Sequence, residues 1–182
     1  EAYILPGIYT DGEPAVKYRG IFLNDEAPCL TSWVKQYYGT DFGDHRFYAQ
    51  VCELILRLKG NFLWPAMWGW AFYADDSLNS KTADEMGVII GTSHHEPMAR
   101  NHQEWARKRN EYGAWNYSTN KKVLDQFFRE GIERVKNTED IITTDLFVNF
   151  LFPVVKNSAA FSTNTGSFER PRIYTSTCIL EA

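Results

Sequence analysis

The chain lacks the residue patterns that mark disulfide-bonded, membrane-spanning and nucleic-acid-binding proteins. Its three cysteines, Cys29, Cys52 and Cys178, are odd in number and far apart, which excludes a disulfide framework and a CxxC metal pair. No apolar run approaches the length of a membrane span. The 19 basic side chains are scattered and the net charge is −4, which argues against a basic nucleic-acid-binding face.

Aromatic side chains, in contrast, are abundant. They make up 15% of the 182 residues and include six tryptophans. Such an excess is typical either of a large aromatic core or of a sugar-binding cleft, and composition alone does not separate the two. The length suffices for one domain with a real core. Because the chain begins with Glu1 and shows no signal peptide, we expect an excised or incomplete segment.

Short apolar runs that end in polar or aromatic residues predict a parallel sheet. Ile21-Phe22-Leu23 leads into Asn24-Asp25-Glu26, Asn61-Phe62-Leu63 leads into Trp64-Pro65, and residues 88–93 lead into His94-His95-Glu96. The carboxyl ends of parallel strands point to one face, where the active sites of open α/β sheets and α/β barrels lie. The polar residues after the three runs are therefore the first candidates for chemistry.

Strands and helices alternate along the chain, which predicts an α/β fold. We expect a long aromatic loop at residues 65–80, and a helix that begins after an N-cap at Asp44 and ends at Gly60. Further helices are expected at residues 30–35, 82–86, 98–109 and 118–136. Expected strands cover residues 18–24, 61–64, 88–93 and 141–143. Four strands are half of what a (β/α)8 barrel requires, so the fold predicted is an incomplete TIM-type barrel, its first half.

The character of the sequence changes after Thr144. Residues 145–155 form an apolar run with neither helical nor strand periodicity, and residues 157–182 are rich in Ser and Thr. We therefore divide the chain into a half-barrel at 1–143 and an aberrant C-terminal tail at 144–182. The composition of that tail predicts disorder.

Asp25, Glu26 and Glu96 are the candidate catalytic carboxyls. Adjacent residues of an extended segment point to opposite sides, so only one of Asp25 and Glu26 can face a site, and the other meets a neighbour or a cap. Glycoside cleavage needs two carboxyl groups across the scissile bond, and Glu96 could supply the second from a common rim. The alternative reading of each acid is a helix cap or an ion pair.

The pair His94 and His95 has three readings. A histidine could hold an acidic or hydroxylated ligand by hydrogen bonds, or the pair could fill the core and cap the next helix. A metal-dependent hydrolase is the lesser alternative, because adjacent histidines lack the i, i+4 spacing of a zinc helix. We expect neither a metal nor a cofactor.

Trp64 and Trp68 follow the second expected strand, in a loop on the active face. The flat C–H faces of sugars stack on such side chains, whereas Phe72 and Tyr73 are expected to pack inward. Asn116-Tyr117-Ser118 reads either as a glycosylation sequon or as the N-cap of the following helix, and its position favours the cap.

Several long motifs in one order, over about residues 5–142, resemble the central barrel of glycoside hydrolase family 115, the xylan α-1,2-glucuronidases. They are YRGIFLNDEAP, ELILRLKGNFLWPAMW, GVIIGTSHHEPM, EWAR and WNYSTNKKVLDQFFREGIERVKN. The resemblance implies a (β/α)8 barrel in a longer, secreted enzyme, with domains on both sides and a homodimeric full-length form. It also implies inverting removal of (4-O-methyl)glucuronic acid from glucuronoxylan, the expected partner.

The resemblance places three residues in the uronic-acid pocket: Asp25, Trp68 and His94. Close to them it places Asn24, Glu26, Trp64, His95 and Glu96. The family pattern stops after Ile142-Thr143, where a loop with Gly, Arg and acidic residues is expected instead of Thr144-Asp145. Two hypotheses follow. The chain is a piece of an α-glucuronidase that is inactive alone, or it is a non-catalytic fragment or weak carbohydrate-binding module.

Overall fold

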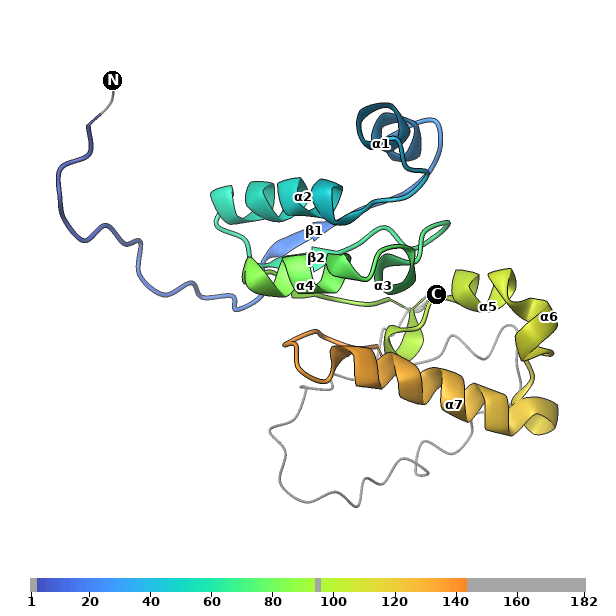
Figure 1. The fold of residues 1–182 in the computed structure, drawn as a ribbon. Coiled ribbons are helices and arrows are strands. Elements are labelled where there is room, and N and C mark those ends of the chain that lie inside the picture. The colour runs from blue at the N-terminus through green and yellow to red at the C-terminus, as the bar shows by residue number, and fades with distance from the viewer. Residues whose placement is uncertain (1–2, 94–95, 144–182) are drawn as a thin grey trace, which may run out of the picture.

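Three short parallel strands form the centre of the structure (Figure 1), a computed structural model that describes residues 3–93 and 96–143. The strands are β1 (Gly20–Phe22), β2 (Phe62–Trp64) and β3 (Ile89–Ile90), in the order β1-β2-β3. A parallel bridge between Gly91 and Ile141 marks the position of the fourth expected strand. The predicted α/β class with a parallel sheet is confirmed, and its membership of a barrel stays a prediction.

Helices cover the sheet and extend beyond it. Within the described residues, α2 and α4 lie side by side against the sheet and α7 packs along the turn η1 (Figure 1). The bounds are α1 Leu30–Tyr38, α2 His45–Arg57, α3 Phe72–Asp75, α4 Leu78–Glu85, η1 Pro97–Ala99, α5 His102–Arg107, α6 Arg109–Tyr112 and α7 Tyr117–Val135.

Helix α2 forms as its sequence predicts. The carboxylate of Asp44 accepts hydrogen bonds from the backbone N–H groups of Arg46 and Phe47, both at 3.1 Å, and so satisfies donors at the helix start. The backbone N–H of Gly60 donates to the carbonyl of Ile55 at 2.8 Å as the helix ends. The predicted N-cap is therefore confirmed. The helix ends at Arg57, before the predicted Gly60, and Lys59 rather than the glycine adopts a positive φ of 60°.

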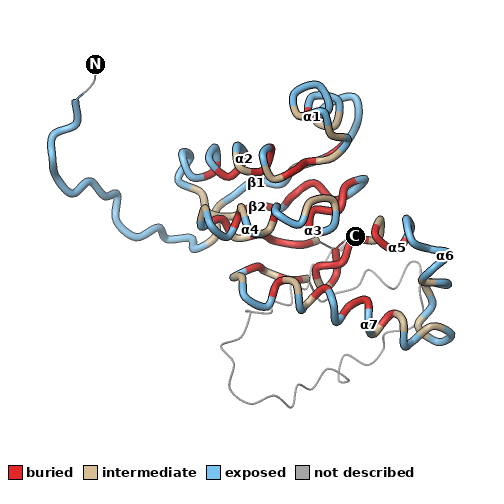
Figure 2. The backbone as a smooth tube through the Cα atoms, in the orientation of Figure 1, coloured by how far each residue is buried: buried red, intermediate tan, exposed pale blue. Residues whose placement is uncertain are grey.

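The core consists of two packed clusters. Figure 2 shows buried residues, in red, along both α2 and α7. The larger cluster joins α2, the sheet and the loop after β2, and includes fully buried Tyr48, Leu63 and Ile90. The smaller packs Trp105 of α5 against Leu124, Phe127 and Phe128 of α7. Cys52 is completely buried in the larger cluster, and burial raises the pKa of its thiol to about 11. The thiol is therefore held in its protonated, unreactive form.

Two predicted elements are wrong. Residues 65–80 are not one loop, because α3 forms at Phe72 and α4 begins at Leu78. The span 98–109 is not one helix either, because Met98 and Ala99 adopt positive φ angles of 51° and 56°. The α-helix begins instead after Asn101, whose side chain and that of Glu104 form a capping box.

The start of α7 follows the favoured reading of its sequence. The side-chain oxygen of Asn116 accepts a hydrogen bond from the backbone N–H of Ser118 at 2.9 Å, which confirms the N-cap. Farther along the helix, Gly131 lies so close to η1 that a Cβ atom there would stand 2.1 Å from the carbonyl oxygen of Met98. The glycine, unfavourable in an isolated helix, thus permits α7 to approach η1.

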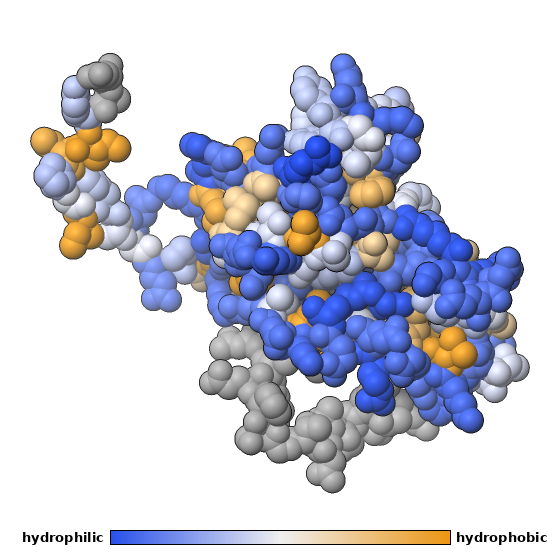
Figure 3. Space-filling view, viewed as in Figure 1, coloured by the Kyte–Doolittle hydropathy of each residue, from blue (hydrophilic) through white to orange (hydrophobic). Residues whose placement is uncertain are grey.

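Residues 3–17 extend away from the body and are exposed (Figure 3). Three of their apolar side chains, those of Ile4, Leu5 and Ile8, are each at least 78% exposed. Within the described part of the chain, no helix is long and apolar enough to span a membrane. The predicted disordered tail at 144–182 lies outside the described residues, as do the apolar run at 145–155 and Cys178.

We predict that Gly131→Ala destabilises the protein although alanine favours helices. The added methyl group meets the Met98 carbonyl and the aliphatic part of Arg100, so the free energy of unfolding should fall by about 1–3 kcal/mol. Urea denaturation measures the change. Lys122→Ala, at an exposed position of the same helix, is the control and should change it by less than about 0.5 kcal/mol. A stabilised Gly131→Ala variant would contradict the close approach.

Candidate active site

The carboxyl ends of β1, β2 and β3 meet at one open pocket of about 340 Å³. Polar groups come from the end of β1, aromatic walls from the end of β2, and a hydroxyl from the segment after β3. The lining residues are Phe22, Leu23, Asn24, Glu26, Trp64, Met67, Trp68 and Ser93. The volume falls in the range of small-molecule sites, and the mixture of apolar walls with a few polar groups is typical of them.

Asp25 and Glu26 point apart, as the alternation of an extended segment predicts. Glu26 is exposed and lines the pocket. Asp25 is buried, and its Oδ2 atom accepts hydrogen bonds from the backbone N–H groups of Gly69 and Trp70 at 2.5 and 2.7 Å. Its Oδ1 atom has no hydrogen-bond partner among the described residues. Asp25 therefore joins the end of β1 to the loop that follows β2.

Trp64 and Trp68 form the aromatic walls of the pocket. Their exposed fractions are 42% and 62%, values that leave ring surface available to a ligand. The Trp64 ring packs edge-on against Phe22, with ring centroids 6.0 Å apart. A Cβ atom at Gly91 would lie 2.2 Å from the Trp64 indole, so the glycine leaves the space in which this ring lies. Gly91, directly after β3, thus makes room for the Trp64 wall of the pocket.

The rest of the aromatic segment turns inward. Trp70, Phe72 and Tyr73 are all at most 8% exposed and pack in the larger core cluster. This confirms the expected inward packing of Phe72 and Tyr73, whereas ligand binding by Trp64 or Trp68 stays a prediction.

Glu96 lies inside the protein and does not line the pocket. Its side chain is 0% exposed, and Asn101 Nδ2 donates a hydrogen bond to its Oε1 at 3.3 Å. Burial raises the pKa of its carboxyl to about 8, because the charged form loses its hydration. Glu96 is therefore protonated at neutral pH, and the expected meeting of Glu96 with an acid of β1 at an open rim is not seen.

His94 and His95 lie outside the described residues, so their predicted contacts stay predictions. The part of the chain that the structure describes contains no group of three His, Cys, Asp or Glu side chains placed to hold a metal ion. Ser93, immediately before the pair, lines the pocket, and its hydroxyl donates to the sulfur of Met67 at 2.7 Å.

Several pocket and support residues were missed from the sequence. Phe22, Leu23 and Ser93 belong to the predicted strand ends, and their positions next to the chosen residues could have indicated them. The sequence did not indicate Asp140, because its contact with Tyr73 forms only in the folded protein. It accepts a hydrogen bond from the hydroxyl of Tyr73 at 2.9 Å, and burial raises the pKa of its carboxyl to about 6.

Comparison with known proteins decides the family. The family model for glycosyl hydrolase family 115 matches residues 11–146. The chain belongs to glycosyl hydrolase family 115. No curated protein sequence matches it significantly. Among solved structures it is similar to BtGH115A, a family GH115 4-O-methyl-α-glucuronidase with specificity for decorated arabinogalactans, at 32% identity and a TM-score of 0.62.

The structural match covers 74% of this chain but only 18% of the glucuronidase chain. The family 115 chain thus spans less than a fifth of the length of that relative. The resemblance read from its motifs is confirmed by both the family model and the structure.

We predict that the protein loses stability as the pH rises. Glu96 has a raised pKa in the folded state, so its contribution is complete below about pH 4.5 and is lost as the pH approaches about 8. Over that range this carboxyl should lower the free energy of unfolding by up to roughly 1.4 kcal/mol per pH unit. Denaturation at several pH values measures the slope.

Glu96→Gln, which keeps the shape of the protonated side chain, should remove most of that slope between about pH 6 and 8, above the raised pKa of Asp140. Glu85→Gln, at an exposed position of α4, is the matched control and should leave the slope unchanged. An equal pH dependence in the wild type and in Glu96→Gln would show that Glu96 is not the buried titrating group.

Proposed function

We propose that this chain supplies one side of the active site of an α-glucuronidase that removes (4-O-methyl)glucuronic acid from polysaccharide side chains. The observation that carries the proposal is the convergence of the three strand ends on one pocket. Asn24 and Glu26 contribute polar groups, and Trp64 and Trp68 contribute aromatic walls. Membership of family 115 and the similarity to a 4-O-methyl-α-glucuronidase support it.

The pocket suits a pyranose ring. Tryptophan rings offer flat apolar faces to the C–H groups of the sugar, while Asn24 and Glu26 can hydrogen-bond to its hydroxyl groups. The apolar Met67 and Phe22 can receive the methyl ether of a 4-O-methylated sugar. His94 and His95, which follow Ser93 in the sequence, are proposed as sugar-binding residues from the family resemblance.

Glu26 is the proposed catalytic carboxyl of this side. Of the three acids predicted as catalytic, it is the one that lines the pocket, whereas Asp25 holds the aromatic loop and Glu96 is enclosed. Inverting hydrolysis requires a second carboxyl roughly 6.5–9.5 Å away across the sugar. We propose that later strands of a barrel provide it, so that the 182-residue chain alone binds the sugar without turnover.

Two polysaccharides are candidate substrates. Family resemblance favours glucuronoxylan, whereas the specificity of BtGH115A favours decorated arabinogalactan as a second candidate. A secreted full-length enzyme and its homodimerisation are proposed from the family resemblance alone. A non-catalytic carbohydrate-binding role would use the same pocket. The metal-dependent hydrolase has no supporting observation among the described residues.

The binding proposal predicts that the 182-residue chain binds 4-O-methylglucuronic acid through its two tryptophans. Trp68→Ala should weaken binding about tenfold, because it removes one stacking wall. Isothermal titration calorimetry measures the dissociation constant. Trp33→Ala is the control, since Trp33 is 40% exposed on α1 and does not line the pocket. Equal weakening by the two variants would contradict the proposed site.

The catalytic proposal is tested in the enzyme extended through the complete barrel. Glu26→Gln should lower the release of glucuronic acid from glucuronoxylan by a factor of about 10²–10⁴, the usual contribution of a general acid or base. Asp41→Asn, an exposed carboxyl ion-paired with Lys35, should leave the rate unchanged. Release assayed in parallel from glucuronidated arabinogalactan decides between the two polymers. Undiminished turnover by Glu26→Gln would refute its role.

A further inference from the structure

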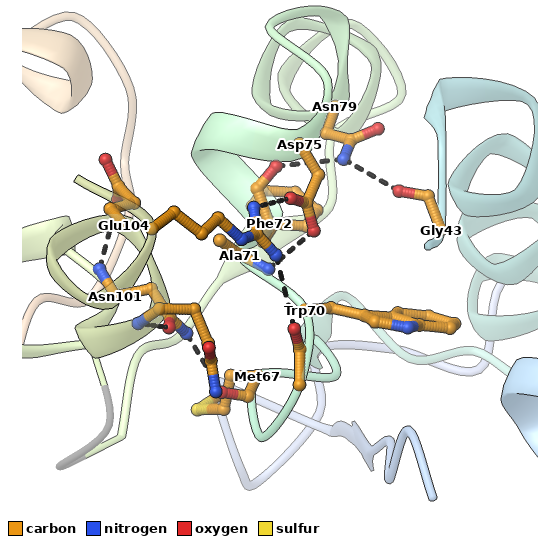
Figure 4. A network of polar contacts seen from close by, with 12 residues as sticks. Gly43, Met67, Trp70, Ala71, Phe72, Asp75, Asn79, Asn101 and Glu104 are labelled. Carbon is orange, nitrogen blue, oxygen red and sulfur yellow. Dashed lines mark hydrogen bonds and ion pairs between the residues drawn. The ribbon is translucent and has the colours of Figure 1, made fainter. Parts of the chain in front are cut away.

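The loop that carries Trp68 is held by side chains from a distant helix. Three consecutive carbonyl oxygens, those of Met67, Trp68 and Gly69, accept hydrogen bonds in the same order from the side chains of Asn101, Gln103 and Arg107. The donor–acceptor distances are 2.9, 3.0 and 3.3 Å. Figure 4 shows Asn101 directed at Met67. Helix α5 and its N-cap thus hydrogen-bond to three successive residues of the loop backbone.

Helix α5 is itself rigidly attached to the rest of the protein. Asn101 and Glu104 close its first turn with a capping box, and both are buried. The carboxylate of Glu104 then accepts two hydrogen bonds from the guanidinium of Arg134 on α7, at 3.1 and 3.0 Å. A bidentate pair of this kind fixes orientation as well as distance. The position of α5 is therefore set by α7.

The N–H groups of the same loop are held from the other side. Asp25 accepts from the backbone N–H groups of Gly69 and Trp70. Asp75 accepts from that of Ala71 at 2.6 Å, and Figure 4 shows these two residues side by side. Asp75 also forms an ion pair with Arg107. Arg107 thus contacts both the Gly69 carbonyl and the carboxylate that holds Ala71, so it joins the two sides.

The backbone around Trp68 is fixed while its ring remains 62% exposed at the pocket. An aromatic wall that is already in place loses little conformational entropy when a ligand stacks on it. We propose that Gln103 and Arg107 are positioning residues that hold the Trp68 wall in its sugar-binding position. This inference rests on the proposed function of the pocket, although the positioning itself can be measured without a sugar.

The first test is hydrogen exchange in the 182-residue chain without ligand. Gln103→Ala and Arg107→Ala should each raise the exchange rates of the Gly69 and Trp70 amides about three- to tenfold, the effect of one lost hydrogen bond. Arg107→Lys, which keeps a cation beside Asp75, should give a smaller increase. Gln50→Ala, at an exposed position of α2, is the matched control and should leave these rates unchanged. Unchanged rates in Gln103→Ala and Arg107→Ala would overturn the inference.

The second test is a double-mutant cycle on the binding of 4-O-methylglucuronic acid. Gln103→Ala should weaken binding about threefold in the wild-type background and should have no further effect in Trp68→Ala, because it acts through that ring. Equal losses in both backgrounds would overturn the positioning role. If the two variants show the predicted exchange changes but the wild-type chain binds no uronic acid, the proposed function is refuted and the positioning role stands.

Discussion

The proposed site depends on the hydrogen bonds that the side chain of Asp25 accepts from the loop after β2. Asp25 stands where β1 ends, is removed from solvent, and accepts hydrogen bonds from two consecutive N–H groups of the loop after β2. A buried carboxyl oxygen that accepts two backbone hydrogen bonds satisfies donors that would otherwise lack partners. One side chain therefore fixes the relative positions of the first two strand ends.

The consequences extend to both sides of Asp25. Because successive side chains of an extended segment alternate, burial of Asp25 directs its neighbours Asn24 and Glu26 to the pocket. On the loop side, the same contact leaves Trp70 buried and Trp68 exposed, so one segment supplies both a core residue and a wall. Gly91 completes the arrangement by leaving room for Trp64 beside β3.

Local signals made part of this structure predictable from the sequence. The apolar runs revealed the parallel strands, and Asp44 and Asn116 revealed two helix starts, because strand burial and N-capping are short-range effects. The division of Asp25 and Glu26 also followed from alternation alone. The buried state of Glu96 could not be foreseen, since it depends on Asn101 and on packing around α3. The same is true of the η1 break, which depends on the approach of α7 at Gly131.

An NMR titration of the ¹⁵N-labelled chain with 4-O-methylglucuronic acid tests whether the three strand ends form one sugar site. We expect chemical-shift changes at the backbone amides of Asn24, Glu26 and Ser93 and at the indole N–H groups of Trp64 and Trp68, all saturating with one dissociation constant. Shifts confined to the exposed Trp33 on α1, or the absence of shifts at the strand ends, would contradict it.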